Sequence, residues 1–316
     1  MPLVIQTEEL DEVTRRWLGE RCELVLCPVE DPRFAELLAE AEALVVRTYT
    51  RVDAALLARA PRLRVVGRAG VGLDNIDVVA CRGRGVEVVH TPDANTRAVV
   101  ELVTAFMLDA LRPRAFVERA MEISEWKRVR RELMAPRQLA DLTLGIIGLG
   151  RVGSAMARVG AAMNMRVLFN DLLPIAPDQR FGAQPMALES LADASDIVTV
   201  HVDDRAGNRD LINEAVFGLM RPDAVFINAS RGFVVDAPAL AAYLKANPAA
   251  QAILDVHEPE PFGADYPLLG LPNAHLTPHI GAATATANRN MSWVVRDVWR
   301  VLNDEKPEFP APATHA

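Results

Sequence analysis

Residues 144–160 read LGIIGLGRVGSAMARVG, an apolar run followed by a glycine-rich turn and a segment of helical composition. Gly148, Gly150 and Gly153 stand in GxGxxG spacing where the run would turn into a helix. Glycines at these positions permit a tight turn and close backbone approach, so a pyrophosphate can lie on the amides of the helix N-terminus. The segment therefore predicts a strand, a turn and a helix that bind a dinucleotide.

An acidic residue ends the next apolar run. Asp171 closes RVLFND, 18 residues beyond Gly153, where a carboxylate can accept hydrogen bonds from ribose hydroxyls. The carboxylate would repel a 2′-phosphate, and residues 172–174 include no arginine to hold one. The sequence predicts NAD rather than NADP. The alternative, glycines that only help a helix pack on a strand, is weaker because strand, helix and acid occur together.

Short apolar runs recur along the chain in two sets. From Leu144 onward they alternate with helix-length segments, which is typical of a doubly wound parallel sheet covered by helices on both faces. The first 95 residues contain another set and predict a smaller α/β domain. An apolar, buried helix should begin near Thr96, and the periodicity of residues 291–302 predicts an amphipathic helix that returns to the smaller domain. The tail EKPEFPAPATHA should be extended or disordered.

Composition argues against several classes of function. The chain has 316 residues, 50% of them hydrophobic, and a formal net charge of −8, so it can form two domains and has no electrostatic reason to bind nucleic acid or anionic lipid. No stretch approaches the roughly 20 apolar residues of a membrane span, and no signal-peptide pattern occurs. Cys22, Cys27 and Cys81 stand in no metal-binding spacing. We expect a cytoplasmic protein without a metal, membrane or nucleic-acid partner.

Polar residues follow the predicted strands of the larger domain. They are His201 after IVTV, then Asn228, Ser230 and Arg231 after AVFI, and Asp255 after AIL. Because ligands of open α/β sheets bind beyond the carboxyl ends of the strands, these residues are candidates for the site by position alone. For His201, a structural hydrogen bond is an equally good interpretation.

Two later segments have the residue types of acid–base chemistry. DVHEPEP, residues 255–261, contains several acids, and LTPHIG, residues 276–281, places His279 in a loop. A neutral histidine can take the proton of an alcohol as its hydride leaves, and a carboxylate on the other ring nitrogen orients the imidazole. A nearby arginine such as Arg231 would hold a substrate carboxylate and polarise the carbonyl. Arg, Glu and His together would form a hydride-transfer site, although each alone could be an ordinary surface residue.

Six motifs, quoted at the end of this paragraph in chain order, give the sequence a resemblance to the D-isomer-specific 2-hydroxyacid dehydrogenases. The resemblance is greatest to the phosphoglycerate dehydrogenase branch, in a short form without a regulatory domain. The likeness runs from about Ala43 to Trp299. It implies an α/β fold of two domains. One is a Rossmann-type doubly wound cofactor domain, residues 96–284, and the other a smaller, discontinuous, flavodoxin-like substrate domain, residues 1–95 and 285–316. The motifs are VVGRAGVGLDNID (65–77), NTRAVVELV (95–103), GIIGLGRVG (145–153), INASRG (227–232), DVHEPEP (255–261) and LTPHIG (276–281).

The resemblance also implies the catalytic roles. Arg231 would bind and polarise the substrate, Glu260 would support the imidazole, and His279 would be the acid/base. Glu258 is the lesser candidate for the acid, because the family places its glutamate five residues after the aspartate of DV and directly before proline.

Further positions follow from the same resemblance. The backbone amides of Val71 and Gly72 would receive the substrate carboxylate, with Asn75 and Arg47 near that pocket. For Arg47, a structural ion pair is an equally good interpretation. The cofactor would be bound by Gly148, Gly150, Arg151, Val152, Gly153, Asp171, His201, Ala229, Ser230, Asp255 and Gly281.

The implied function is NAD-dependent hydride transfer between the nicotinamide and C2 of a small D-2-hydroxy or 2-keto acid. The substrate stays open among 3-phosphoglycerate, hydroxypyruvate or glyoxylate, and larger hydroxy acids. The alternative is an NAD(H)-sensing corepressor-like binding protein with little turnover, which His257 in place of the usual aromatic slightly favours. A homodimer through the cofactor domain is implied, with the helix after Asn95 available for the interface. Asp203 and Asp204 depart from the pattern and bring negative charge towards the nicotinamide side.

Overall fold

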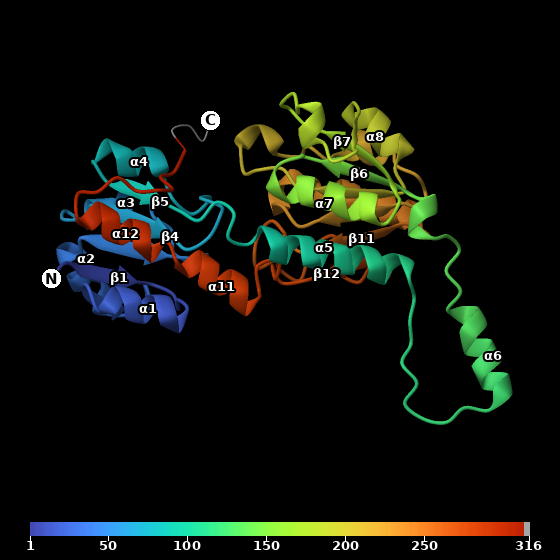
Figure 1. The fold of residues 1–316 in the computed structure, drawn as a ribbon, viewed down its shortest axis with the longest axis horizontal. Helices are drawn as coiled ribbons and strands as arrows, with labels where there is room; N and C mark the ends of the chain where they lie inside the picture. The colour runs from blue at the N-terminus through green and yellow to red at the C-terminus, as the bar shows by residue number, and fades with distance from the viewer. Residues whose placement is uncertain (313–316) are drawn as a thin grey trace. The chain divides into compact units, whose positions relative to one another are not determined.

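The computed structural model describes residues 1–312 and divides into two compact units. Unit 1 comprises Met1–Ala98 and the chain from Ala282 onward, and unit 2 comprises Val99–Gly281 (Figure 1). The sequence predicted that the chain passes from one domain to the other after residue 95 and back again at residue 285. Both units are α/β, as expected.

Unit 1 is built on a five-stranded sheet in the order β2-β1-β3-β4-β5, with every pair of neighbours parallel. This is the flavodoxin-like order. The sheet is flanked by helices, three of which begin at aspartates, Asp11, Asp53 and Asp77, whose side chains accept hydrogen bonds from backbone amides of the first turn. The elements are β1 (Leu3–Gln6), α1 (Glu12–Gly19), β2 (Glu23–Leu26), α2 (Phe34–Glu40), β3 (Ala43–Val46), α3 (Ala54–Ala58), β4 (Val65–Arg68), α4 (Val78–Gly83) and β5 (Glu87–Val89).

The returning segment forms two helices rather than the one predicted over residues 291–302, and the second of them packs on this sheet. They are α11 (Ala285–Ser292) and α12 (Val295–Leu302). A glycine in β4 lets α12 approach closely, because a Cβ on Gly67 would lie 2.4 Å from Cγ2 of Val298. Unit 1 is therefore completed by residues distant in sequence from its first five strands.

The tail beyond α12 covers one edge of this sheet. The nitrogen of Ala311 donates to the carbonyl oxygen of Val88 at 2.7 Å, and the nitrogen of His90 donates to that of Phe309 at 3.1 Å. Pairing along an exposed edge strand satisfies backbone groups that would otherwise face solvent. The part up to residue 312 is therefore extended and hydrogen-bonded to β5, whereas residues 313–316 lie outside the described residues.

Unit 2 contains a seven-stranded parallel sheet in the order β12-β11-β10-β9-β6-β7-β8. The strand order reverses at β6, which is the doubly wound arrangement predicted from the sequence. Ile146 of β6 packs with α5 and α7, and Ile147 with α8 and α10, so the sheet separates two apolar cores. The elements are α5 (Thr96–Leu111), α6 (Ile123–Glu132), β6 (Thr143–Ile147), α7 (Arg151–Ala162), β7 (Arg166–Asn170), β8 (Gln184–Pro185), α8 (Leu188–Ala194), β9 (Ile197–Val200), α9 (Glu214–Phe217), β10 (Val225–Asn228), α10 (Ala237–Ala246), β11 (Gln251–Leu254) and β12 (Ala274–Leu276).

The apolar helix expected near Thr96 is α5, and its buried side chains, Val103 and Met107 among them, belong to the core of unit 2. After α5, the chain extends away from the body of unit 2 over residues 112–138, which contain α6 (Figure 1). We call this segment the arm. No residue of α6 is buried, and Phe116 and Met134 of the arm are 85% and 73% exposed. The exposed apolar surface of this region therefore lies on the arm rather than on α5.

No helix among residues 1–312 is long and apolar enough to cross a membrane.

Candidate active site

The glycine turn after β6 has the geometry that its spacing predicted. Gly148 has a φ of 90°, and a Cβ there would lie 2.6 Å from the carbonyl oxygen of His201. A Cβ on Gly153 would lie 1.9 Å from the oxygen of Gly148, so α7 packs against the turn only with glycine there. By contrast, a Cβ on Gly150, the N-cap of α7, would meet nothing within 4 Å. The N-terminus of α7 is therefore open to a ligand, and this turn fits a pyrophosphate.

The acid predicted to bind ribose lies beside this turn. Oδ2 of Asp171 accepts a hydrogen bond from the nitrogen of Leu149 at 2.7 Å, and Oδ1 from that of Leu173 at 2.8 Å. These bonds hold the carboxylate at the carboxyl edge of the sheet, and each oxygen keeps a further lone pair for a hydroxyl. The residues predicted to hold the adenosine half of NAD thus fit that group.

The side chain of His201 does not take part in this arrangement. Its Nε2 is 2.9 Å from Oγ1 of Thr199, and burial lowers the pKa of the imidazole to about 3. The ring is therefore neutral and structural, while its backbone carbonyl packs against the glycine turn.

Asp203 and Asp204 come shortly after His201, and the negative charge of Asp203 is neutralised by neighbouring residues. Arg205 donates to its carboxylate from Nε at 2.8 Å and from Nη2 at 2.5 Å, and Asn208 donates at 2.9 Å. At Asp203, the departure from the family pattern therefore brings an ion pair rather than an uncompensated charge.

Arg231 lies three residues after the end of β10, in a turn held by the buried side chain of Asn228. Oδ1 of Asn228 accepts from the nitrogen and hydroxyl of Ser230 at 3.0 and 2.8 Å, and its Nδ2 donates to the carbonyl oxygen of Arg231 at 2.9 Å. A Cβ on the next residue, Gly232, would lie 2.0 Å from the carbonyl of His257. The absence of a side chain at Gly232 thus brings the Arg231 turn against the loop that carries the acids.

The predicted acid and histidine are bonded to each other. Oε2 of Glu260 is 2.7 Å from Nδ1 of His279, and Oε1 accepts from the nitrogen of His257 at 2.6 Å. Because a carboxylate only accepts, Nδ1 donates, and Nε2 lies on the other side of the ring. The other predicted candidate, Glu258, instead pairs with Arg209 at 2.8 Å.

Electrostatics poise this pair for proton transfer. The hydrogen bond to Glu260 raises the pKa of His279 against the opposing effect of burial, and the positive charge of Arg231 also acts to lower it. Burial would raise the pKa of Glu260, but its bonds to His279 and to the His257 nitrogen bring the pKa below its usual value. His279 has a φ of 54°, a left-handed conformation that is rare for a non-glycine residue and that often occurs at active sites. The structure thus brings Arg231, Glu260 and His279 together.

Asp255, predicted to contact the cofactor, anchors the loop that carries His279. Its fully buried carboxylate accepts from Oγ1 of Thr277 at 2.6 Å and from the nitrogens of Ile280 and Gly281 at 2.8 and 2.7 Å. Its carbonyl oxygen accepts from the nitrogen of His279 at 2.9 Å. The position of His279 is therefore fixed on both sides.

The predicted substrate residues of unit 1 lie in two neighbouring loops. Among residues 1–312 nothing accepts a hydrogen bond from the backbone nitrogens of Val71 and Gly72, so both stay available as donors. Asn75 ties the loops together, because its Nδ2 donates to the carbonyl oxygens of Arg47 and Thr50 at 3.0 and 2.6 Å.

The guanidinium of Arg47 is held within unit 1. It donates to the carbonyl oxygen of Glu9 at 3.1 Å and to the side chain of Asn288. These contacts favour the structural interpretation of Arg47. The loop itself is anchored by Glu8, whose carboxylate accepts from the four backbone nitrogens of residues 47–50.

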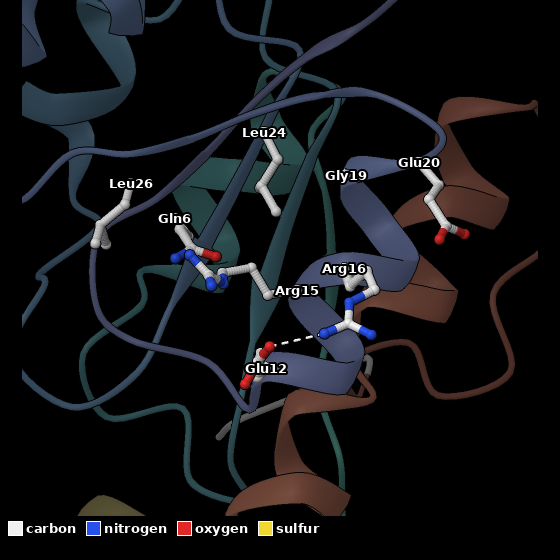
Figure 2. Close-up of a pocket in the computed structure, with 8 residues that line it drawn as sticks. All are labelled: Gln6, Glu12, Arg15, Arg16, Gly19, Glu20, Leu24 and Leu26. Atoms are coloured by element: carbon white, nitrogen blue, oxygen red, sulfur yellow. Dashed lines mark hydrogen bonds and ion pairs between the residues drawn. The ribbon is translucent and has the colours of Figure 1, made fainter.

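A separate recess of about 380 Å³ lies beside α1 and β2 in unit 1 (Figure 2). It is lined by Gln6, Arg15, Gly19 and Leu24 among others, and by none of the predicted substrate residues. Gln6 is fully buried, and neither polar atom of its side chain has a hydrogen-bond partner among the described residues. This recess is thus distinct from the loops discussed above.

Comparison with known proteins identifies the family. Residues 104–281 match the model of the D-isomer specific 2-hydroxyacid dehydrogenase, NAD binding domain. The chain is also 36% identical over 301 residues to (S)-sulfolactate dehydrogenase of Chromohalobacter salexigens, covering 93% of this chain and 96% of that protein. The chain belongs to the D-isomer-specific 2-hydroxyacid dehydrogenase family.

Other members of this family give the same result. D-3-phosphoglycerate dehydrogenase of Archaeoglobus fulgidus is 39% identical over 259 residues, which cover 81% of this chain. The match spans 48% of that protein, so the chain extends over about half the length of this relative. The solved D-lactate dehydrogenase from Aquifex aeolicus, complexed with NAD and lactic acid, superimposes with a TM-score of 0.81 at 27% identity over 96% of both chains. The predicted family, α/β fold and NAD cofactor are confirmed.

Three positioning residues of this family member were missed in the sequence. Glu8 lies three residues beyond a predicted strand, Gly232 follows Arg231, and Thr277 precedes His279 by two. Position at a strand end could have pointed to Glu8, and adjacency to a predicted site residue could have pointed to Gly232. Nothing in the sequence states that Thr277 would bond to Asp255, because that contact joins two strand ends.

Proposed function

We propose that this chain catalyses hydride transfer between NAD and C2 of a small D-2-hydroxy acid or its 2-keto partner. The observation that carries the proposal is the 2.7 Å contact between Glu260 and His279, with the charge of Arg231 acting on the same imidazole. The glycine turn and Asp171 lie at the same carboxyl edge of the parallel sheet. The residues proposed to bind the cofactor and those proposed for acid–base chemistry thus share one edge, where ligands of such sheets bind.

In this proposal His279 moves the proton. During oxidation, Nε2 removes the hydroxyl proton of the substrate, and Glu260 stabilises the imidazolium that forms through its hydrogen bond to Nδ1. During reduction the protonated ring returns that proton to the carbonyl oxygen. NAD, when bound, supplies the acceptor or donor of the hydride.

Two further groups hold the substrate in the proposal. Arg231 binds the carboxylate and polarises the carbonyl, a role in which loss of the donor typically reduces turnover by about 100-fold or more. The backbone nitrogens of Val71 and Gly72 receive the carboxylate, which their unused donors support. The substrates are of the 3-phosphoglycerate, hydroxypyruvate or glyoxylate type, consistent with relatives named for phosphoglycerate and sulfolactate.

A substrate panel tests this function. NADH absorbance is followed with hydroxypyruvate, glyoxylate, 3-phosphohydroxypyruvate, pyruvate and branched 2-keto acids, and the panel is repeated with NADPH. We expect NADH-dependent turnover on at least one acid, with NADPH much less effective because of Asp171. His279→Ala serves as control, because it should retain NADH binding by fluorescence and lose turnover. NADH binding without turnover on any acid would instead support the corepressor-like alternative.

We also propose a homodimer formed through the arm of the cofactor domain. Phe116, Ile123, Trp126 and Met134 expose apolar side chains over this segment, a composition typical of protein interfaces. Light scattering coupled to size-exclusion chromatography should give twice the chain mass, and Trp126→Glu combined with Phe116→Glu should give the monomer. A monomeric wild-type protein would exclude this assembly.

We finally propose a cytoplasmic location. The three cysteines of the chain are buried and unpaired, which fits a reducing compartment. Cell fractionation with an antibody to the chain tests this, and recovery with the membrane or secreted fraction would contradict it.

A further inference from the structure

His257 joins the two loops that carry the acid–base pair. Its backbone nitrogen donates to Oε1 of Glu260 at 2.6 Å, and its ring Nε2 is 2.9 Å from the carbonyl oxygen of Thr277, two residues before His279. A phenylalanine ring at this position would keep the backbone contact but could not form the bond to Thr277.

The contacts of the ring determine which nitrogen carries the proton. A carbonyl oxygen only accepts, so Nε2 of His257 must donate to Thr277. On the other side, Nδ1 is 3.4 Å from the hydroxyl of Tyr266. Burial raises the pKa of Tyr266 to about 12, so its hydroxyl keeps its proton at neutral pH and can donate to Nδ1. Both contacts are satisfied by the tautomer of His257 that carries its proton on Nε2.

Packing holds this ring in place. His257 is buried, with its ring edge-on to Phe262 at 4.7 Å and to Tyr266 at 5.5 Å between centroids. The backbone of Gly232 lies against the carbonyl of His257, where any side chain would collide. The residue therefore contacts the turn of Arg231, the loop of Glu260 and the loop of His279 at once.

We propose that His257 is a positioning residue for the acid–base pair: its ring clamps the loop of Glu260 to the loop of His279 through Thr277. The proposal rests on Glu260 and His279 acting as in the proposed function. Without the clamp, the two loops would still be joined by the bonds to Asp255 at the start of the Glu260 loop, but beside the acid–base pair only by the Glu260–His279 contact, which is partly exposed to solvent. A small loss of alignment in such a pair reduces turnover strongly.

Two substitutions separate hydrogen bonding from packing. His257→Phe keeps a planar ring between Phe262 and Tyr266 but removes the donor to Thr277. His257→Gln places an amide donor near the position of Nε2. We expect kcat to fall about 10-fold in the phenylalanine variant, with KM for NADH unchanged, and to recover largely in the glutamine variant. Tyr266→Phe, which removes only the 3.4 Å contact, should have a smaller effect.

A titration independent of turnover tests the clamp directly. Nitrogen NMR of the full chain labelled with ¹⁵N-histidine reports the tautomer of His257 and the pKa of His279. The other groups that act on His279, namely Glu260, Asp255 and Arg231, are unchanged in both variants. We expect the Nε2–H tautomer at His257, and a His279 pKa that falls towards its ordinary value in His257→Phe and returns in His257→Gln.

The outcomes are distinct. A proton on Nδ1 of His257, or a His279 pKa and kcat unaltered in the phenylalanine variant, would overturn the proposal. If that variant does not fold, the wild-type tautomer and the glutamine variant decide. Absence of turnover on every keto acid would overturn the proposed function instead, and the titration would still test the clamp.

Discussion

Two buried polar side chains at strand ends behave in opposite ways. Asp255, directly after β11 in unit 2, accepts three hydrogen bonds from the loop that carries His279. Gln6, the last residue of β1 in unit 1, has no hydrogen-bond partner among residues 1–312. In unit 1 the anchoring role belongs instead to Glu8, which holds the loop of Arg47. A polar residue at the end of a strand thus organises a loop only where donors converge on it.

Substitution within the Glu260–His279 pair, whose histidine lies in the loop held by Asp255, should have the largest effect. Glu260→Gln keeps the shape but cannot stabilise the imidazolium, so kcat should fall about 100-fold or more. Stopped-flow and steady-state assays with the best keto acid measure this, and Glu258→Gln, which affects only the ion pair with Arg209, is the matched control. Equal losses in both variants would contradict the assignment of Glu260.

The same variant should change the pH dependence in a defined direction. Reduction needs protonated His279, whose pKa is raised by its hydrogen bond to Glu260, so the rate should be constant at low pH and fall as pH passes that raised pKa. Oxidation needs the neutral ring and should show the opposite trend. In Glu260→Gln the pKa of His279 should drop, so the fall in reduction should begin at lower pH. An unshifted profile would mean that another group titrates.

Substitution of Asp255, which anchors the His279 loop, should have the next largest effect. Asp255→Ala leaves three donors of the His279 loop, of which the Gly281 nitrogen is buried, without their acceptor, and the free energy of unfolding should fall by about 3 kcal/mol. Thr277→Val removes one of these bonds and should lower it by about 1 kcal/mol. Urea denaturation measures both values. Equal stabilities for the two variants would show that the loop does not depend on Asp255.

The anchor of unit 1 should affect substrate binding more than chemistry. Glu8→Ala removes the acceptor shared by four backbone nitrogens and should raise KM for the keto acid several-fold with a smaller change in kcat. Glu9→Ala is the control, because only its backbone carbonyl contacts Arg47. A change in kcat alone would place the effect outside substrate binding.

The smallest effect is expected at Gln6, and it has the opposite sign. Gln6→Leu replaces a buried polar group without a partner by an apolar one of similar size, so the free energy of unfolding should rise by about 1 kcal/mol. Differential scanning calorimetry measures the change. A loss of stability would show that the amide has a partner in solution, and the contrast with Asp255 would then disappear.

Sequence patterns determined much of this protein. The glycine spacing and Asp171 predicted the dinucleotide turn because local backbone freedom and one acid define it. Short apolar runs that alternate with helix-length segments predicted both parallel sheets. A strand that is buried on both faces is apolar throughout and does not alternate between apolar and polar residues. Arg231, Glu260 and His279 were predicted as site residues from their motifs, and the structure brings the three side chains near one another.

Other features were decided only by tertiary structure. The partners of Asp255, and the anchoring roles of Glu8 and His257, depend on which strand ends lie side by side. The break between α11 and α12 and the pairing of the tail with β5 were likewise not predicted, because they follow from packing on the sheet. The physical reason is common to all: periodicity encodes which face of an element is buried, whereas a hydrogen bond between distant loops requires the folded sheet to bring its two ends within about 3 Å.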